Sequence, residues 1–333
     1  MNAFAIESEM QETIDVIRSF DPRAVAPFAP RHERIVIAGE GSSRLFPARN
    51  AIAWALRHGV DRTVLTEGAL QAREYALDGR HLFVSSNSGR TAEGVALIRS
   101  VLDQRRSAAE TPITAVVSDG DSPIAREADD AFVLRCGAER AVAATKSVVE
   151  QALFFRTLLA GTAEGGAADA PFPALAHAFG RALQAPLPDG LVDRCNGAVS
   201  IAFAGRNDGV AEELALKANE IARTRSAFFE GTYAVHGVEE VLTDRDVIIV
   251  VEPFADQEAK FSEVLSDGVG AAVFAIATRQ TSFPTIVVDE VPGWTEFILL
   301  AAGWNVLLNV GKARGIDLDN PERARKVGNE VAE

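Results

Sequence analysis

The order of hydrophobic runs along the chain constrains its fold more than any other feature. Short apolar runs, typical of buried strands, alternate with longer segments in which apolar residues recur at helical spacing. After a first helix near residues 7–20, we expect strands at "RIVIAG" (34–39), "TVLT", "HLFVSS" and "ITAVVS", with helices between them. This alternation is typical of a parallel sheet covered by crossover helices, so the sequence predicts an α/β fold.

A second series of the same kind follows residues 163–173, "AEGGAADAPFP", whose composition predicts a linker. Its expected strands are "AVSIAFAG" (198–205), "DVIIVVE", "AAVFAIAT" and "TIVVD", and its expected helices are "VAEELALKANEIARTR", a segment near 257–266 and "GWTEFILLAAGWNVLLNVGKARG". "IVIAGEGSS" and "SIAFAGRND" both pass from a strand through glycine and polar residues into a helix. We therefore interpret the chain as a duplicated α/β module, with modules at 1–165 and 166–333.

The totals exclude several classes of function. The 333 residues, 47% of them apolar, can fill two cores, and a net charge of −14 argues against nucleic-acid binding. Two cysteines without a CxxC spacing and five singly placed histidines predict neither a disulfide framework nor a metal site. The acidic, amphipathic N-terminus and the lack of a run of about 18 apolar residues predict a cytoplasmic protein without membrane contact.

The stretch "VSSNSGRT" (84–91) stands where a strand is expected to turn into a helix. A helix start leaves backbone N–H groups without partners and carries partial positive charge, so it suits an anion. An ordinary helix cap by Ser88 or Thr91 is the simpler interpretation, but one cap needs one such residue, and the stretch supplies several hydroxyls. We interpret it as a ligand-binding loop.

A dinucleotide-binding domain is the competing interpretation of the fold. It is weakened because the segment "GEGSSR" after the first expected strand lacks the third glycine of the G-x-G-x-x-G motif.

Other polar segments fall at corresponding places. "GSS" (41–43) follows the first expected strand, so both serine-rich turns should lie at the carboxyl edge of one sheet, one for an anion and one for sugar hydroxyls. "AERAVAATKS" (138–147) reads as a helix start with open function. In the second half, Glu220 on a helix and His236 in a glycine-flanked loop could together move protons on a sugar, although a lone glutamate is usually a solvated helix residue.

Several motifs in order resemble one family. "GEGSSRLFPARNA", "SSNSGRTAEGV", "AERAVAATKS", "ELALKANEIARTRSAFFEGTYAVHG" and "GIDLDNPERARKV" resemble successive motifs of sugar isomerase (SIS) domain proteins. This family includes the isomerase half of glucosamine-6-phosphate synthase, sugar-phosphate deaminases and fructosamine-6-phosphate deglycases. The resemblance implies two tandem SIS modules, each a flavodoxin-like three-layer sandwich, and a cofactor-free, metal-free enzyme acting on a small-molecule sugar phosphate.

The resemblance also assigns roles. Glu220 is similar to the base that shuttles a proton between C1 and C2, and His236 to the ring-opening histidine, which the family donates across a homodimer interface. Lys217 and Lys326 match lysines near the reacting carbons, and the tail that carries Lys326 closes over the sugar. Substrate-binding positions implied by the motifs are Gly41, Ser42, Ser43, Ser86, Asn87, Ser88, Thr91, Ala143 and Ala144.

The departures from the family pattern leave the reaction open. The usual His-Gly-Pro is here His236-Gly237-Val238 followed by two glutamates, which resembles deglycases, whereas "AVAATKS" favours a glucosamine-6-phosphate-type deaminase. No glutaminase segment with a catalytic cysteine precedes the first module, so we expect no release of ammonia from glutamine. We expect an isomerase or deaminase acting on an open-chain hexose with an anionic C6 group. A deglycase, an isomerase of a C6-sulfonated sugar and a non-catalytic sensor remain alternatives.

Overall fold

The computed structural model describes residues 4–161, 171–325 and 329–331. They form two compact units, each built around one parallel sheet. The described parts of 19–140, 144–170 and 323–333 make the first-sheet unit, and those of 1–18, 141–143 and 171–322 make the second-sheet unit. The predicted module boundary near residue 165 and most of the predicted linker lie outside the described residues, so that boundary stays a prediction.

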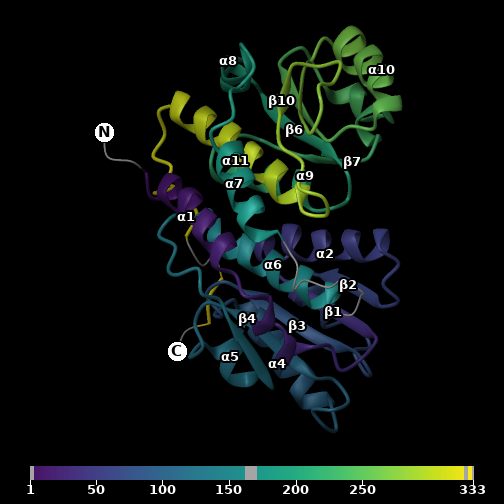
Figure 1. Cartoon of the computed structure of the whole chain (residues 1–333), viewed down its shortest axis with the longest axis vertical. Helices are drawn as coiled ribbons and strands as arrows, with labels where there is room; N and C mark the ends of the chain where they lie inside the picture. Colours follow the sequence, from purple (N-terminus) through teal and green to yellow (C-terminus); the bar gives the residue numbers. More distant parts are fainter. Residues whose placement is uncertain (1–3, 162–170, 326–328, 332–333) are drawn as a thin grey trace. The chain divides into compact units, whose positions relative to one another are not determined.

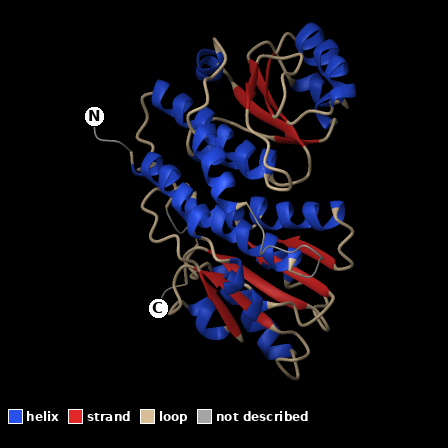
Figure 2. Ribbon diagram, viewed as in Figure 1, coloured by secondary structure: helices blue, strands red, loops and turns tan. Residues whose placement is uncertain are grey.

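The first sheet is fully parallel with strand order β2-β1-β3-β4-β5. Its strands are β1 (Arg34–Gly39), β2 (Thr63–Glu67), β3 (His81–Ser86), β4 (Ile113–Val117) and β5 (Asp130–Val133). Figures 1 and 2 show helices on both faces of this sheet. The three inner strands are almost wholly buried, which explains why they read as continuous apolar runs rather than as alternating ones.

Alternate residues of these strands face different helical layers. One set, including Val36, Leu82 and Ala115, packs in one core cluster with residues of α3 (Ala69–Ala72), α4 (Ala92–Gln104) and α5 (Pro123–Glu127). The opposite set includes Phe83, whose ring contacts Phe154 and Phe155 of α6 (Lys146–Ala160). Helix α2 (Leu45–Arg57) packs against α6, and the short 3₁₀ helices η1 (Pro22–Ala24), η2 (Ala26–Phe28) and η3 (Gly41–Ser43) complete the unit.

The second sheet is also parallel, with strand order β10-β9-β8-β6-β7. Its strands are β6 (Ser200–Gly205), β7 (Phe228–Glu230), β8 (Asp246–Val251), β9 (Ala272–Ala277) and β10 (Thr285–Val287). Read from the other side, the order is β7-β6-β8-β9-β10, which repeats the first sheet strand for strand. The shared topology supports the predicted duplication, and the predicted fold class is confirmed.

Helices flank the second sheet as well. The elements α7 (Phe172–Ala182), α8 (Leu191–Gly197) and α9 (Val210–Glu220) pack against the long α11 (Thr295–Ala313). The predicted helix near 257–266 is α10 (Glu258–Phe261) continued by the π-helix η8 (Ser262–Val269), whose Leu265 packs in the core cluster of the sheet's other face. Short 3₁₀ helices are η5 (Tyr233–Val235), η6 (Val238–Val241) and η7 (Ala255–Gln257).

The first helix, α1 (Ala5–Ser19), groups with the second-sheet unit except for its last residue, whereas the sequence placed it in the first module. The backbone N–H groups of Ala5 and Ile6 donate to the carboxylate of Asp319 at 2.6 and 3.0 Å. The Glu7 carboxylate pairs with Lys312 at 2.8 Å. Asp319 thus caps α1 from a site more than 300 residues away, which no local pattern can reveal. Within the described residues, no helix is both long and apolar enough to cross a membrane.

Candidate functional site

The stretch 86–91, called the serine loop from here on, follows β3 and leads into α4. The Ser86 hydroxyl accepts hydrogen bonds from the Gly89 N–H and from the Thr91 hydroxyl, both at 3.1 Å. The Ser88 hydroxyl accepts one from the Arg90 N–H at 3.2 Å. Thr91 occupies the cap position of α4, yet its side chain makes no capping bond to the helix. The geometry therefore does not match a simple helix cap by Thr91.

Gly89 lets the serine loop pass close to the next connection of the sheet. Its φ is +65°, and a side-chain Cβ at this position would lie 2.0 Å from the Ser122 hydroxyl. The Gly89 carbonyl accepts from the Ile124 N–H at 3.1 Å, and the Asn87 carbonyl accepts from the N–H and hydroxyl of Ser118. The loop is thus held in one shape by the segment after β4, as a preformed binding loop requires.

The turn after β1 lies at the neighbouring strand end, because Gly39 of β1 is in register with Ser85 of β3. Gly41 has a φ of +50° and opens the 3₁₀ turn η3, which buries Ser42 and leaves Ser43 half-buried. The two predicted serine-rich turns therefore stand side by side at the carboxyl edge of the first sheet. The fold therefore places Gly41, Ser42 and Ser43 at the strand end next to that of Ser86, and their roles in binding stay predictions.

The third polar segment, 138–147, leads into α6. Glu139 accepts hydrogen bonds from the Thr145 N–H at 2.7 Å, from the Ser147 hydroxyl at 2.7 Å and from the Asn87 side-chain amide at 2.8 Å. Of the predicted substrate contacts here, Ala144 is half-buried in the first-sheet unit, and Ala143 is buried and groups with the second-sheet unit. Glu139 was not among the site residues predicted from the sequence.

Near the chain's C-terminal end, residues 329–331 lie along the start of α4. The Ala92 N–H donates to the Asn329 carbonyl at 3.0 Å, and the Val331 N–H donates to the Arg90 carbonyl at 3.1 Å. Thr91 and Glu330 form an antiparallel bridge. The predicted catalytic residue Lys326, in the same tail, lies outside the described residues, so its role stays a prediction.

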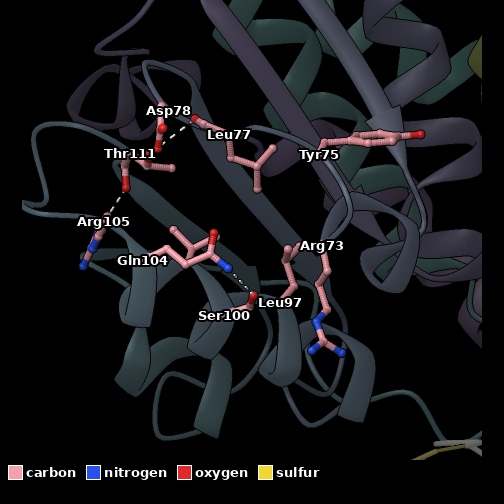
Figure 3. A pocket seen from close by; sticks show the side chains of 10 residues that line it. Arg73, Tyr75, Leu77, Asp78, Leu97, Ser100, Gln104, Arg105 and Thr111 are labelled. Carbon is pink, nitrogen blue, oxygen red and sulfur yellow. Dashed lines mark hydrogen bonds between the residues drawn. The ribbon is translucent and has the colours of Figure 1, made fainter.

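A hollow between α4 and the segment that follows α3 lies at the opposite, amino edge of the first sheet (Figure 3). Several of its polar groups are bound to one another: the Thr111 hydroxyl donates to the Leu77 carbonyl, and the Gln104 amide donates to the Ser100 hydroxyl. The Arg105 guanidinium donates hydrogen bonds to the Thr111 carbonyl and to the Asp129 carboxylate. Burial by itself would raise the pKa of Asp129, but the hydrogen bonds to this carboxylate, that from Arg105 foremost, outweigh burial and lower the pKa. These contacts stabilise the fold rather than prepare a ligand site.

In the second-sheet unit, α9 carries two predicted catalytic residues. The Lys217 ammonium lies 2.7 Å from the Glu220 carboxylate and 3.4 Å from the Glu213 carboxylate. The side chains of Lys217 and Glu213 are fully buried, whereas that of Glu220, the last residue of α9, is 29% exposed. The ammonium is therefore anchored inside the protein, and the carboxylate that can reach a ligand is the one at the helix end. Glu213 was missed in the sequence, although its i,i+4 spacing to Lys217 signals the pair.

His236 follows η5 and is exposed. Its ring Nε2 lies 3.2 Å from the Thr232 hydroxyl, and among the described residues it makes no hydrogen bond or ion pair with Glu220. Gly237 has a φ of +102°, and its N–H donates to the Glu239 carboxylate at 2.6 Å. The loop that carries His236 is thus shaped by its own residues, and the imidazole is presented to the outside.

The two parallel sheets of one repeated topology form the two-module α/β fold that the resemblance to SIS domain proteins implies. No protein-family model matches the chain. It is 27% identical over 310 residues to the glutamine–fructose-6-phosphate aminotransferase (isomerizing) of Mycolicibacterium smegmatis, an alignment that covers 82% of this chain and 47% of the relative. The chain therefore spans about half the length of the curated relatives it matches.

Solved structures agree on the fold. The C-terminal domain of glucosamine-fructose-6-phosphate aminotransferase from Francisella tularensis superposes with a TM-score of 0.76 at 18% identity, over 95% of this chain and 97% of that one. The glucosamine-6-phosphate deaminase of Thermotoga maritima gives a TM-score of 0.73 at 17% identity, over 97% and 98%. The resemblance to SIS proteins that the motifs predicted is confirmed.

Proposed function

We propose that the chain is a sugar-phosphate isomerase or deaminase that transfers a proton between C1 and C2 of an open-chain hexose with an anionic group at C6. The observation that carries the proposal is the 2.7 Å pair of Lys217 and Glu220. A carboxylate that moves a proton between two adjacent carbons must be held in place, and the ion pair with the buried Lys217 ammonium holds this one. The similarity to sugar-phosphate aminotransferases and to a deaminase fold supports this class of reaction.

The serine loop is the evidence for an anionic group at C6 of the substrate. Hydroxyls of Ser86, Ser88 and Thr91 stand at the start of α4, where the helix dipole and backbone N–H groups favour negative charge. Ser42 and Ser43 at the neighbouring strand end are suited to the sugar hydroxyls. Proton transfer of this kind is acid–base chemistry and needs no cofactor or metal.

We infer that the active unit is a homodimer in which His236 serves the partner's site. Its imidazole is exposed, and the same loop region exposes Tyr233 by 57% and Val241 by 78%. Large exposed apolar side chains near a candidate catalytic residue are typical of a surface that another chain covers. In this role the histidine would take a proton from O1 and give one to O5 to open the ring.

A deglycase is the second candidate, favoured by the acid four places after the histidine. Glu239 is occupied by the Gly237 N–H, whereas Glu240 is exposed. Glu240 is thus the carboxyl group of this pair that is open to a ligand. A C6-sulfonated substrate would use the same neutral hydroxyl donors as a phosphate, and a pure sensor would have no use for the Lys217–Glu220 pair.

The test is hydrogen exchange in heavy water, followed by proton NMR. Fructose 6-phosphate, glucose 6-phosphate, glucosamine 6-phosphate and a C6-sulfonated hexose are each incubated with the protein, and ammonia is measured in parallel. Exchange at C1 or C2 that disappears in Glu220→Gln supports the proposal. Ammonia release selects the deaminase, and binding of any of these sugars without exchange in the wild-type protein would establish the sensor instead.

The roles of the two residues are separated with 5-deoxyfructose 6-phosphate, a ketose phosphate that lacks the O5 needed to close its ring and therefore stays open-chain. Glu220→Gln should abolish exchange with cyclic and acyclic substrates alike. His236→Asn should lose about 10²–10⁴-fold on ring-forming sugars and much less on the 5-deoxy analogue. Equal losses on both would assign His236 to the carbon chemistry or to the release of an amine.

A further inference from the structure

A single carboxylate joins two loops of the first-sheet unit that lie far apart in sequence. The Glu139 side chain accepts hydrogen bonds from the Asn87 amide (2.8 Å), the Thr145 N–H (2.7 Å), the Ser147 N–H (3.3 Å) and the Ser147 hydroxyl (2.7 Å). Asn87 belongs to the serine loop, and Thr145 and Ser147 form the start of α6. The carboxylate therefore reaches the candidate anion site and a buried helix at the same time.

The α6 contact makes Glu139 a rigid anchor. The cap residue of α6, Thr145, makes no side-chain cap bond, and the first-turn N–H group of Ser147 donates instead to Glu139. All fifteen residues of α6 are buried, so the end of this helix has little freedom to move. A carboxylate is also favoured there by the helix dipole. Asn87 is thus tied to one of the most constrained elements of the unit.

The chemistry of the cluster requires an acceptor with no proton of its own. The groups of Asn87, Thr145 and Ser147 that bind Glu139 are donors, and an ionised carboxylate accepts on both oxygens. The side-chain amide nitrogen of Asn87 donates to Glu139, and the backbone carbonyl of Asn87 accepts from the Ser118 hydroxyl, so both parts of the residue have a defined orientation. The shape of the serine loop therefore depends on a residue that lies outside it.

We propose that Glu139 is a positioning residue that holds the serine loop in the shape that binds the C6 anion. The proposal deepens the proposed function and rests on it for the identity of the ligand. Its effect falls on binding rather than on proton transfer, because Glu139 acts through Asn87 at the anion end of the substrate. Glu139→Gln should raise the KM for the C6-anionic substrate about tenfold, the effect of one lost hydrogen bond to a charged group, with kcat changed by less than about twofold.

The experiment has two readouts. The first is deuterium exchange of the backbone amides of residues 86–91, which needs no ligand: Glu139→Gln should speed exchange in this loop. The second is the separate measurement of KM and kcat with fructose 6-phosphate or whichever C6-anionic sugar exchanges its C1 or C2 proton. The matched control is Asp246→Asn, which removes a buried carboxylate bound by Ser200 and Thr243 at the amino end of β8. It should leave loop exchange and KM unchanged.

If Glu139→Gln folds poorly, variants that exchange the donor and the acceptor between Asn87 and Glu139 provide a second test. Asn87→Asp places two carboxylates 2.8 Å apart and should speed loop exchange and raise KM, whereas Asn87→Asp with Glu139→Gln restores a donor and an acceptor and should recover part of both. Loop exchange that stays at the wild-type rate in Glu139→Gln and in Asn87→Asp would overturn the positioning role. A fall in kcat at constant KM would overturn it as well. If the wild type turns over no C6-anionic sugar, the proposed function is refuted. Deuterium exchange of the backbone amides of residues 86–91 would then still decide whether Glu139 holds the serine loop in place.

Discussion

The Lys217 ammonium lies between two carboxylates of its own helix, 2.7 Å from Glu220 and 3.4 Å from Glu213. Lys217 and Glu213 are fully buried, so this pair is anchored by the core while Glu220 remains accessible. The three residues lie along two turns of α9, with the buried carboxylate on one side of Lys217 and the accessible one on the other. Glu213 balances the charge of Lys217 inside the protein, and Lys217 fixes the outer carboxylate.

Lys217→Met should therefore damage stability and activity together. Removing one partner of a buried ion pair leaves the other charge uncompensated, and the free energy of unfolding should fall by about 3–5 kcal/mol. The double variant Lys217→Met with Glu213→Gln should regain much of that stability, because no buried charge is left, yet remain inactive. Urea unfolding measures the stability, and exchange of the substrate's C1 or C2 proton in heavy water measures the activity. A double variant that regains activity would show that Lys217 has no part in the chemistry.

Ser88→Ala and Thr91→Ala should weaken substrate binding while the fold is kept. Each hydroxyl contributes one donor at the start of α4, and a hydrogen bond to a charged group contributes about 1.5–3 kcal/mol. The loss should be seen as a higher KM with an unchanged melting temperature. Ser100→Ala in the amino-edge hollow is a matched control. Unchanged kinetics in the double serine-loop variant would mean that the loop does not bind the anion.

Mixed dimers test the proposed sharing of His236. Glu220→Gln and His236→Asn proteins should each be inactive on ring-forming sugars, and a mixture allowed to exchange subunits should regain activity. One of the two sites in each mixed dimer then has both residues intact. The mixed species is isolated with two affinity tags, so that its formation is established independently. An isolated mixed dimer without activity would place both residues in the same subunit's site.

His81 should make the first-sheet unit sensitive to acid. Its ring is buried, with Nδ1 accepting from the Arg31 N–H and Nε2 beside the Thr114 hydroxyl, and burial with the nearby Arg31 lowers its pKa from 6.5 to about 4. Between these values the unfolded chain binds more protons than the folded one, so the free energy of unfolding falls as the pH drops from about 6.5 towards 4, by up to about 1.4 kcal/mol per unit.

The measurement is the urea unfolding midpoint across this pH range in the wild type, in His81→Phe and in the exposed control His58→Gln. His81→Phe should be less stable at pH 7 but should lose less stability on acidification than the wild type. His58→Gln should follow the wild type. Parallel curves for His81→Phe and the wild type would show that His81 does not titrate with folding.

Much of this protein is determined locally and was predicted from the sequence. The strand at 34–39 was placed at its observed residues, and the serine-rich turns were placed at the carboxyl ends of their strands. The spacing of Lys217 and Glu220 on one helix brings them together without help from the rest of the chain. In each case the periodicity of a single helix or strand fixes which side chains are neighbours.

Packing decided the rest. The edge strands β5 and β7 were not predicted, because they are short and become strands only by pairing with β4 and β6. The sequence could not show that α1 is capped by Asp319, or that Asn87 is held by Glu139 from 52 residues away. It also could not show that every residue of α6 is buried. These features depend on which surfaces meet when the sheets are assembled, and contacts between distant segments leave no period in the sequence.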